Sequence, residues 1–381
     1  MKTRKDNLLT LDKFIEESLY NKKNGYYMKK NPFGAKGDFI TSPNISILFS
    51  EMIAIWIISF WENLKCPNKF NLIELGAGNG EMMKTLISTF KKFPKFKKSC
   101  DIKIFEKSIF LKNLQKKNIK NENIEWLKNL NELNNLPSIF IANEFFDALP
   151  IKQFIKKKNK WYERHIKISH QKNSEFKDIL YDMKKFENSI KLKWYERCVN
   201  FTDKQKIDYL DVPFNIINFE KKIQFKISQN QKFIEYSFLA AEYLKIITSK
   251  IKYNSGGILI IDYGYNDKKI KNTLQAVSKH KYINVLKGFK NSDITYNLNL
   301  NLFNQIIKKF GTFNFFTTNQ KNFLTKLGIL KRAEILSKNM TFSNKVNVYF
   351  RVKRLIDEKQ MGDLFKVIFI TNKKNKFKLG F

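Results

Sequence analysis

The sequence predicts an α/β fold: a doubly wound, Rossmann-like sheet with an N-terminal helical segment and an inserted subdomain. Three observations lead to this prediction. Short apolar runs alternate with stretches of helical spacing between residues 71 and 142, which indicates parallel strands joined by helices. A glycine-rich turn, Gly76–Gly80, follows the first of these runs. The alternation is lost between residues 156 and 230, where charge is dense, and it returns afterwards.

The first half of the chain starts with a predicted helix at 11–19, because Leu11, Phe14, Ile15 and Leu19 recur at helical spacing. A loop rich in glycine, proline and aromatic residues follows at 25–43. We expect Asn44 to cap a helix that runs to about Leu64. Strands are predicted at 71–75, 102–105, 124–127 and 139–142, with a helix at 82–90.

The second half resumes with a predicted helix at 233–251 and an apolar strand at 258–261. Late strands are expected at 312–316 and 365–371, and the basic tail from Lys373 onward is expected to be frayed. Four regions follow from this pattern: N-terminal helices with a covering loop (1–68), the first half of the core (69–155), an insertion or substrate subdomain (156–230) and the second half of the core (231–381).

The net charge is +36, from 71 Lys and Arg against 35 Asp and Glu. Such a surplus attracts phosphate polymers, anionic membranes or acidic proteins. Compositional drift can produce the same surplus, and we favour this explanation. Lysine is spread over evident surface stretches such as 156–160 rather than gathered in one motif with aromatic residues. Nucleic-acid binding is therefore the less favoured interpretation of the net charge.

Several classes of protein are disfavoured by particular residues. The cysteines, Cys66, Cys100 and Cys198, form no C-x-x-C pair, and the three histidines show no metal-ligand spacing, so we expect no metal site. The most apolar segment, 52–61, is too short to span a bilayer, so no membrane insertion is expected. Acidic residues interrupt the N-terminal region where a secretory or transit peptide would need none, which predicts a cytoplasmic protein.

Polar motifs stand at the ends of three predicted strands, and in an open α/β sheet such ends meet at one crevice. The first is the run 74–80, ELGAGNG, which is neither G-x-G-x-x-G nor a Walker loop. Its glycines let the backbone approach a ligand closely, and Glu74 suits a cationic ligand better than a pyrophosphate. An ordinary strand–helix turn is the alternative interpretation.

The other two motifs are acidic. Glu106, at the end of the next strand, can accept both hydroxyls of a ribose, or it can be a strand-end residue that faces solvent. The third motif, 143–150 (NEFFDALP), places Glu144 and Asp147 three residues apart. Two such acids can hold a guanidinium by bidentate hydrogen bonds, or Asp147 can serve a helix N-terminus, and both roles can coexist.

With these motifs the sequence resembles the MidA-like family of class I S-adenosylmethionine-dependent methyltransferases, over nearly the whole chain. The runs that carry the resemblance are Gly25–Tyr27, GDFITSP at 37–43, ELGAGNG at 74–80, NEFFDALP at 143–150, Ile234–Ser237, Ile260–Tyr265, Thr273–Ala276, Gln320–Ile329 and Met361–Val367. Two positions depart from the family pattern. Asn44 stands where a Glu is usual, and Asn79 where an Arg or a similar residue often stands.

The resemblance implies S-adenosylmethionine as cofactor, protein arginine as acceptor and a subunit of the respiratory NADH dehydrogenase complex as substrate. It implies cofactor contacts by Glu74, Gly76, Gly78 and Glu106, with Asp38 and Thr41 closing over the cofactor from the N-terminal loop. On the acceptor side it leaves Asn143, Glu144 and Asp147, of which Glu144 is expected to grip the guanidinium and Asp147 to support it.

Two alternatives remain open from the sequence. The chain is basic, and Asn143 at a strand end loosely resembles the motif of nucleic-acid amino methylases, although no Pro-Pro follows it and Glu144 would repel phosphate. A protein that binds S-adenosylmethionine and assists assembly without turnover is the other alternative.

Overall fold

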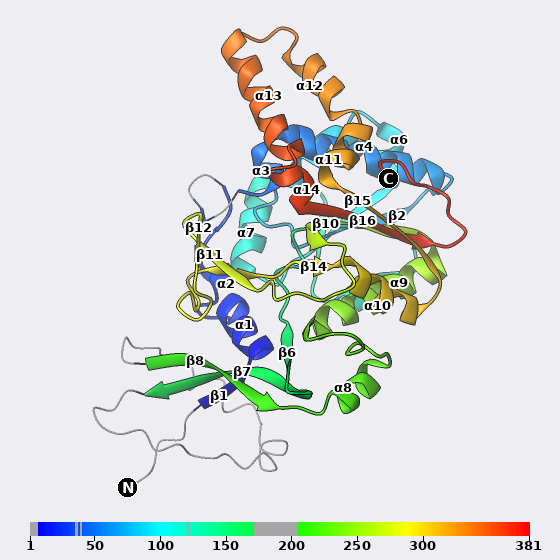
Figure 1. Ribbon diagram of the computed structural model, residues 1–381. Coiled ribbons are helices and arrows are strands. Elements are labelled where there is room, and N and C mark those ends of the chain that lie inside the picture. Colours follow the sequence, from blue (N-terminus) through cyan, green and yellow to red (C-terminus); the bar gives the residue numbers. More distant parts are fainter. Residues whose placement is uncertain (1–6, 35–36, 39, 121, 171–204) are drawn as a thin grey trace. The chain divides into compact units, whose positions relative to one another are not determined.

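The computed structural model describes residues 7–34, 37–38, 40–120, 122–170 and 205–381 (Figure 1). The contacts divide the chain into two compact units. The smaller takes residues 1–14 and 152–234, and the larger takes 15–151 and 235–381. Residues 171–204 of the insertion predicted at 156–230, which include Cys198, lie outside the described residues.

The larger unit is built on an eight-stranded sheet, which confirms the doubly wound α/β prediction. Its strands are β2 (Phe70–Leu75), β3 (Cys100–Phe105), β4 (Ile124–Leu127), β5 (Ser138–Asn143), β10 (Gly256–Tyr265), β14 (Leu298–Asn299), β15 (Phe313–Asn319) and β16 (Phe365–Asn372). The order is β15-β16-β10-β5-β2-β3-β4, and β14 pairs with the last two residues of β10. All neighbours are parallel except β16, which runs antiparallel to β10 and β15.

The position of the site follows from this order. The chain builds β2, β3 and β4 outward in one direction and then crosses to the other side of β2 to form β5 and β10. The crossover leaves a crevice outside the carboxyl ends of β2 and β5, which is where ligands bind in open α/β sheets. Every residue of β2 and β5 is buried, because the sheet packs between helices.

Helices of the larger unit that are buried on one face are amphipathic, and a helix that is buried nearly all round, such as α4 (Ile47–Asn63), is apolar. In α5 (Glu81–Phe90) the buried positions are Met82, Met83, Leu86, Ile87 and Phe90, as the spacing predicts. The other long helices are α4 (Ile47–Asn63), α7 (Ile109–Asn118), α9 (Phe238–Asn254), α10 (Leu300–Phe310) and α13 (Phe342–Ile356). Shorter ones are α2 (Tyr26–Lys29), α3 (Ser42–Ile45), α6 (Pro94–Ser99), η1 (Leu130–Glu132), α11 (Gln320–Lys326), α12 (Ile329–Ser337) and α14 (Met361–Leu364).

Two smaller sheets complete the description. In the larger unit, β11 (Gln275–Ser278), β12 (Lys281–Ile283) and β13 (Asp293–Thr295) form an antiparallel sheet in the order β12-β11-β13. In the smaller unit, β1 (Asn7–Thr10), β6 (Lys152–Lys157), β7 (Lys160–His170), β8 (Gln205–Pro213) and the first residues of β9 (Phe233–Tyr236) belong to a five-stranded sheet in the order β1-β7-β6-β9, in which β8 pairs with β7. Helix α8 (Ile216–Ile223) is in the same unit. Helix α1 (Leu11–Tyr20) covers the predicted 11–19 helix. Among the described residues, no helix is both long and apolar enough to cross a membrane.

Two predicted helix starts are wrong. Asn44 lies inside the short helix α3, and Ser46 caps α4 instead, by accepting the N–H of Leu48. Pro43 favours a helical turn that starts earlier than predicted, so the cap moves to the next competent side chain. The helix expected at 233–251 begins only at Phe238, because Ser237 caps it, and Phe233–Tyr236 forms strand β9.

The expectation of a frayed tail after Lys373 is also wrong. Phe377 packs edge-on against Trp56 at a ring distance of 5.6 Å, and Phe381 packs against Phe323. The indole N–H of Trp56 donates to the carbonyl of Leu379 at 3.0 Å. The burial of aromatic side chains therefore outweighs the solvation of the intervening lysines.

Candidate functional site

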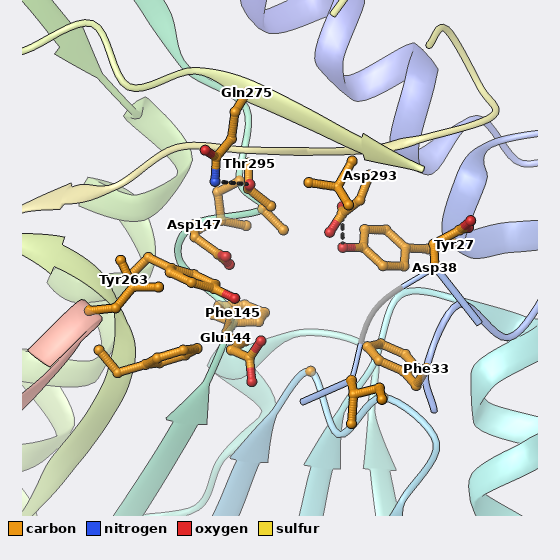
Figure 2. A pocket seen from close by; sticks show the side chains of 18 of the residues that line it. Tyr27, Phe33, Asp38, Glu144, Phe145, Asp147, Tyr263, Gln275, Asp293 and Thr295 are labelled. Carbon is orange, nitrogen blue, oxygen red and sulfur yellow. Dashed lines mark hydrogen bonds between the residues drawn. The ribbon is translucent and has the colours of Figure 1, made fainter. Parts of the chain in front are cut away.

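A cavity of about 540 Å³ lies in the larger unit, where the strand ends of the main sheet meet (Figure 2). Six predicted site residues line it: Asp38, Gly76, Gly78, Glu106, Glu144 and Asp147. The other three, Thr41, Glu74 and Asn143, line an adjoining cavity of about 40 Å³ that shares Gly76, Gly78 and Glu144 with the first. The structure thus brings all nine to one region.

The turn after β2 requires its glycines. Gly76 and Gly78 have φ values of +67° and +53°, a region that side chains with a Cβ rarely occupy. A Cβ on Gly76 would lie 2.7 Å from Cδ2 of Phe145, and one on Gly78 would lie 3.1 Å from the ring of Phe33. The turn therefore offers bare backbone to anything that enters the cavity.

Two acids flank this turn. Glu74 is 2% exposed, and its Oε2 has no hydrogen-bond partner among the described residues. Burial, with the charge of Glu106 nearby, raises the pKa of Glu74 to about 8. Burial also raises the pKa of Glu106 to about 7, although this carboxyl accepts the N–H of Ser108 at 2.8 Å and the amide of Gln115 at 3.0 Å. Both acids would gain from a cation or a hydrogen-bond donor in the cavity.

The loop after β5 has a constrained backbone. Glu144 adopts φ +51°, which is rare for a residue other than glycine and concentrates at functional sites. Its N–H donates to the carbonyl of Ile261 at 2.9 Å, and its Oε1 accepts the side-chain amide of Asn143 at 3.1 Å. The carboxylate of Asp262, which lies in β10 one residue beyond its pairing with β5, accepts the N–H groups of Phe146 at 2.9 Å and Asp147 at 3.2 Å.

The acids of this loop repel one another. Burial, followed by the charge of Asp262, raises the pKa of Glu144 to about 8 and the pKa of Asp147 well above its usual range. Figure 2 shows the carboxyl groups of Glu144 and Asp147 pointing into the same space, with the ring of Tyr263 beside them. A cation placed there would relieve both the desolvation and the repulsion.

The N-terminal loop contributes Asp38, whose carboxylate is already bound within the protein. It pairs with Lys30 at 2.5 Å and accepts the hydroxyl of Tyr26 at 2.7 Å and the N–H of Lys279 at 2.8 Å. Burial alone would raise the pKa of Asp38, but these hydrogen bonds outweigh burial and lower it. Thr41 is also engaged, because its hydroxyl donates to Oδ1 of Asn44 at 2.9 Å. The departure from the family pattern at Asn44 therefore lies directly beside a predicted site residue.

Sequence reasoning missed further residues of the cavity. Asp293, on β13, accepts the hydroxyl of Tyr27 at 2.6 Å, and burial raises its pKa to about 6. No periodic pattern marks the segment around Asp293, so nothing local could have indicated it. Asp262 does not line the cavity but binds the loop that does, and it could have been found, because it is an acid at the end of an apolar run, as Glu74 and Glu106 are.

Residues 52–317 match the family model of S-adenosyl-L-methionine-dependent methyltransferases, which is more than half of the chain. The chain belongs to the MidA-like family of class I methyltransferases. Relatives span nearly all of this methyltransferase. The mitochondrial protein arginine methyltransferase NDUFAF7 of Xenopus laevis is 26% identical over 94% of this chain and 80% of its own length. The human protein of that name is 24% identical over 94% and 78%.

A solved structure shares the fold of this methyltransferase. It is a superfamily member from Burkholderia thailandensis, crystallised with S-adenosyl-homocysteine, with a TM-score of 0.74 and 19% identity over 98% of this chain and 90% of that one. The cytoplasmic localisation predicted above is contradicted by the relatives, which are mitochondrial proteins. The interrupted N-terminal pattern was therefore an inadequate guide to the compartment.

The cavity of the methyltransferase fits S-adenosylmethionine, the cofactor of the family. The ligand carries a positive sulfonium and a positive ammonium, and the partnerless Oε2 of Glu74 is a buried acceptor without a donor among the described residues. The bare backbone at Gly76 and Gly78 leaves room for close approach, and Glu106 lies at the end of the neighbouring strand. The prediction of this cofactor is confirmed by the family match.

Proposed function

We propose that this methyltransferase methylates an arginine side chain of a protein, and that the protein is a subunit of the respiratory NADH dehydrogenase complex. The curated relatives are named protein arginine methyltransferases, which supports the choice of acceptor. The family resemblance supports the choice of complex. The observation that carries the proposal is a group of three acids that line one cavity, the buried Asp147 and Asp293 and the half-buried Glu144.

A guanidinium suits this group of acids better than a neutral acceptor does. It is a planar cation with five N–H donors, and it binds carboxylates in pairs of hydrogen bonds. Burial is the largest cause of the raised pKa of each of the three carboxyl groups. A bound cation would therefore stabilise the carboxylate form of each group. A phosphate-bearing acceptor such as a nucleic acid would instead raise the pKa values of these acids further and would find no positive charge among them.

The reaction forms a bond between nitrogen and methyl as the bond between sulfur and methyl breaks, in line. Bound S-adenosylmethionine supplies the electrophilic methyl group. Glu144 grips the guanidinium and accepts the proton that the attacking nitrogen gives up, and Asp147 holds the second edge of the group. Asn143 orients Glu144 through its amide at 3.1 Å. Alignment of this kind contributes roughly 7–11 kcal/mol to catalysis.

Mass spectrometry of NADH dehydrogenase subunits tests the proposal. Subunits from cells that lack the protein should lose methylation at one arginine, and the wild-type chain should restore it. The Glu144→Gln variant should not restore it, although it should bind S-adenosylmethionine within about threefold of wild type in calorimetry. Unchanged arginine methylation in cells without the protein would refute the proposed substrate. Full restoration by Glu144→Gln would refute the role of Glu144.

A further inference from the structure

Helix α13 carries two apolar faces, although a surface helix normally carries one. Val348, Val352 and Leu355 pack toward the core of the larger unit. A second set at helical spacing faces outward and is largely exposed: Phe342 at 83%, Val346 at 51%, Tyr349 at 43% and Phe350 at 66%. We call these four residues the α13 stripe. Figure 1 shows α12 and α13 projecting from the rest of the larger unit.

The α13 stripe is surrounded by positive charge. Helix α13 contains Lys345, Arg351, Lys353 and Arg354 and no Asp or Glu. Exposed aromatic side chains beside cations favour a partner surface that is apolar and acidic. A second copy of the chain joined α13 to α13 would instead bring two cationic helices together, which like-charge repulsion disfavours.

The same helix leads to the cavity. Arg354, in the last turn of α13, lines the cavity, as do Lys359, Gln360 and Met361 just beyond it. Phe350 precedes Arg354 by four residues, which is about 6 Å along a helix axis. A protein that places a side chain in the cavity therefore lies within reach of the α13 stripe.

We propose that the α13 stripe is the docking surface for the protein substrate, which contacts it with an acidic and apolar face. This inference rests on the proposed function for the identity of the substrate. The stripe holds the substrate protein while the arginine occupies the cavity, so it contributes to affinity for the intact protein and not to the chemistry at the acids.

The test compares Val346→Asp and Phe350→Asp with Tyr253→Asp, a matched control. Tyr253 is 75% exposed but lies on α9, and all three changes leave the buried core untouched. The probes are the isolated NADH dehydrogenase subunit that carries the methylated arginine and a short peptide with the same arginine. Binding to the full chain loaded with S-adenosylmethionine and methylation kinetics are measured separately.

We expect both α13 variants to weaken binding of the intact subunit and to raise its KM by about tenfold or more, because exposed aromatic anchors dominate protein interfaces. The short peptide should be methylated within about twofold of wild type, and Tyr253→Asp should behave as wild type. An unchanged KM for the intact subunit would overturn the docking surface. The proposal would also be overturned if the wild-type protein formed a dimer that Phe350→Asp separates into monomers. It would be overturned as well if Phe350→Asp abolished binding to phosphatidylglycerol vesicles while the KM for the intact subunit stayed constant. Binding that depends on α13 without any arginine methylation would instead refute the proposed function alone.

Discussion

The carboxylate of Asp262 accepts the backbone N–H of Asp147 at 3.2 Å, so one buried acid within β10 fixes the position of another on the loop after β5. Asp262 is 1% exposed and also accepts the N–H groups of Phe146 and Tyr263. It therefore acts through the loop rather than on the acceptor.

We expect Asp262→Asn to lower kcat/KM by about tenfold to a hundredfold, because an amide oxygen accepts these N–H groups more weakly than a carboxylate. The free energy of unfolding should fall by about 1.5–3 kcal/mol, the range for hydrogen bonds to charged groups. Affinity for S-adenosylmethionine, measured by calorimetry, should stay within about threefold. Normal turnover with normal stability would show that Asp262 does not position the loop.

Gly76→Ala should abolish tight cofactor binding. The new Cβ would lie 2.7 Å from Phe145, and the residue must keep φ near +67°. We expect affinity for S-adenosylmethionine to fall by about tenfold or more. Gly328→Ala is the matched control, because Gly328 has φ +85° with nothing within 4 Å of its Cβ position. It should cost about 1–2 kcal/mol of stability and leave cofactor affinity unchanged.

The rate should depend on pH through Glu144. Burial and the charge of Asp262 raise the pKa of this carboxyl to about 8, so the free enzyme holds it mainly protonated below that value. Only the carboxylate can accept a proton, and kcat/KM for an arginine peptide should therefore rise between pH 6 and 8 and level off above about pH 9. The profile of kcat should lie at lower pH, because a bound guanidinium stabilises the carboxylate. A profile that falls over this range would exclude Glu144 as the base.

The ligand-free protein should lose stability as pH rises from 6 to 9. Glu74 and Glu106 have folded-state pKa values of about 8 and about 7, above the usual 4.5. The native state therefore binds more protons than the unfolded state, and the stability these groups contribute is complete below pH 4.5 and lost as pH passes the folded values. Thermal melts should show this decline, and saturating S-adenosylmethionine should raise Tm more at pH 8 than at pH 6. The double variant Glu74→Gln with Glu106→Gln should make the decline smaller, and the part that remains comes from the raised pKa values of Glu144, Asp147 and Asp293.

The main sheet and the acidic rim could be predicted because their signals are local. An apolar run that ends in an acid or a glycine turn, as at Glu74 and Glu106, specifies both the strand and what stands at its end. Tyr27 and Asp293 meet only through contacts between segments 266 residues apart, and no spacing rule connects them. The cap of α4 was misplaced for a different reason. Asn44 and Ser46 are both competent caps, and the choice between them depended on the short helix α3, which begins at Ser42 and has Pro43 in its first turn.

The outward apolar face of α13 also bears on how the molecules behave in solution. At low ionic strength a net charge of +36 keeps separate molecules apart, whatever aromatic side chains they expose. Salt shortens the range of that repulsion to about 3 Å at 1 M, and Phe342 and Phe350 of different molecules can then come into contact. Colloidal stability should therefore fall as salt is added, the reverse of ordinary salting-in, and an acidic partner that covers the helix should restore it.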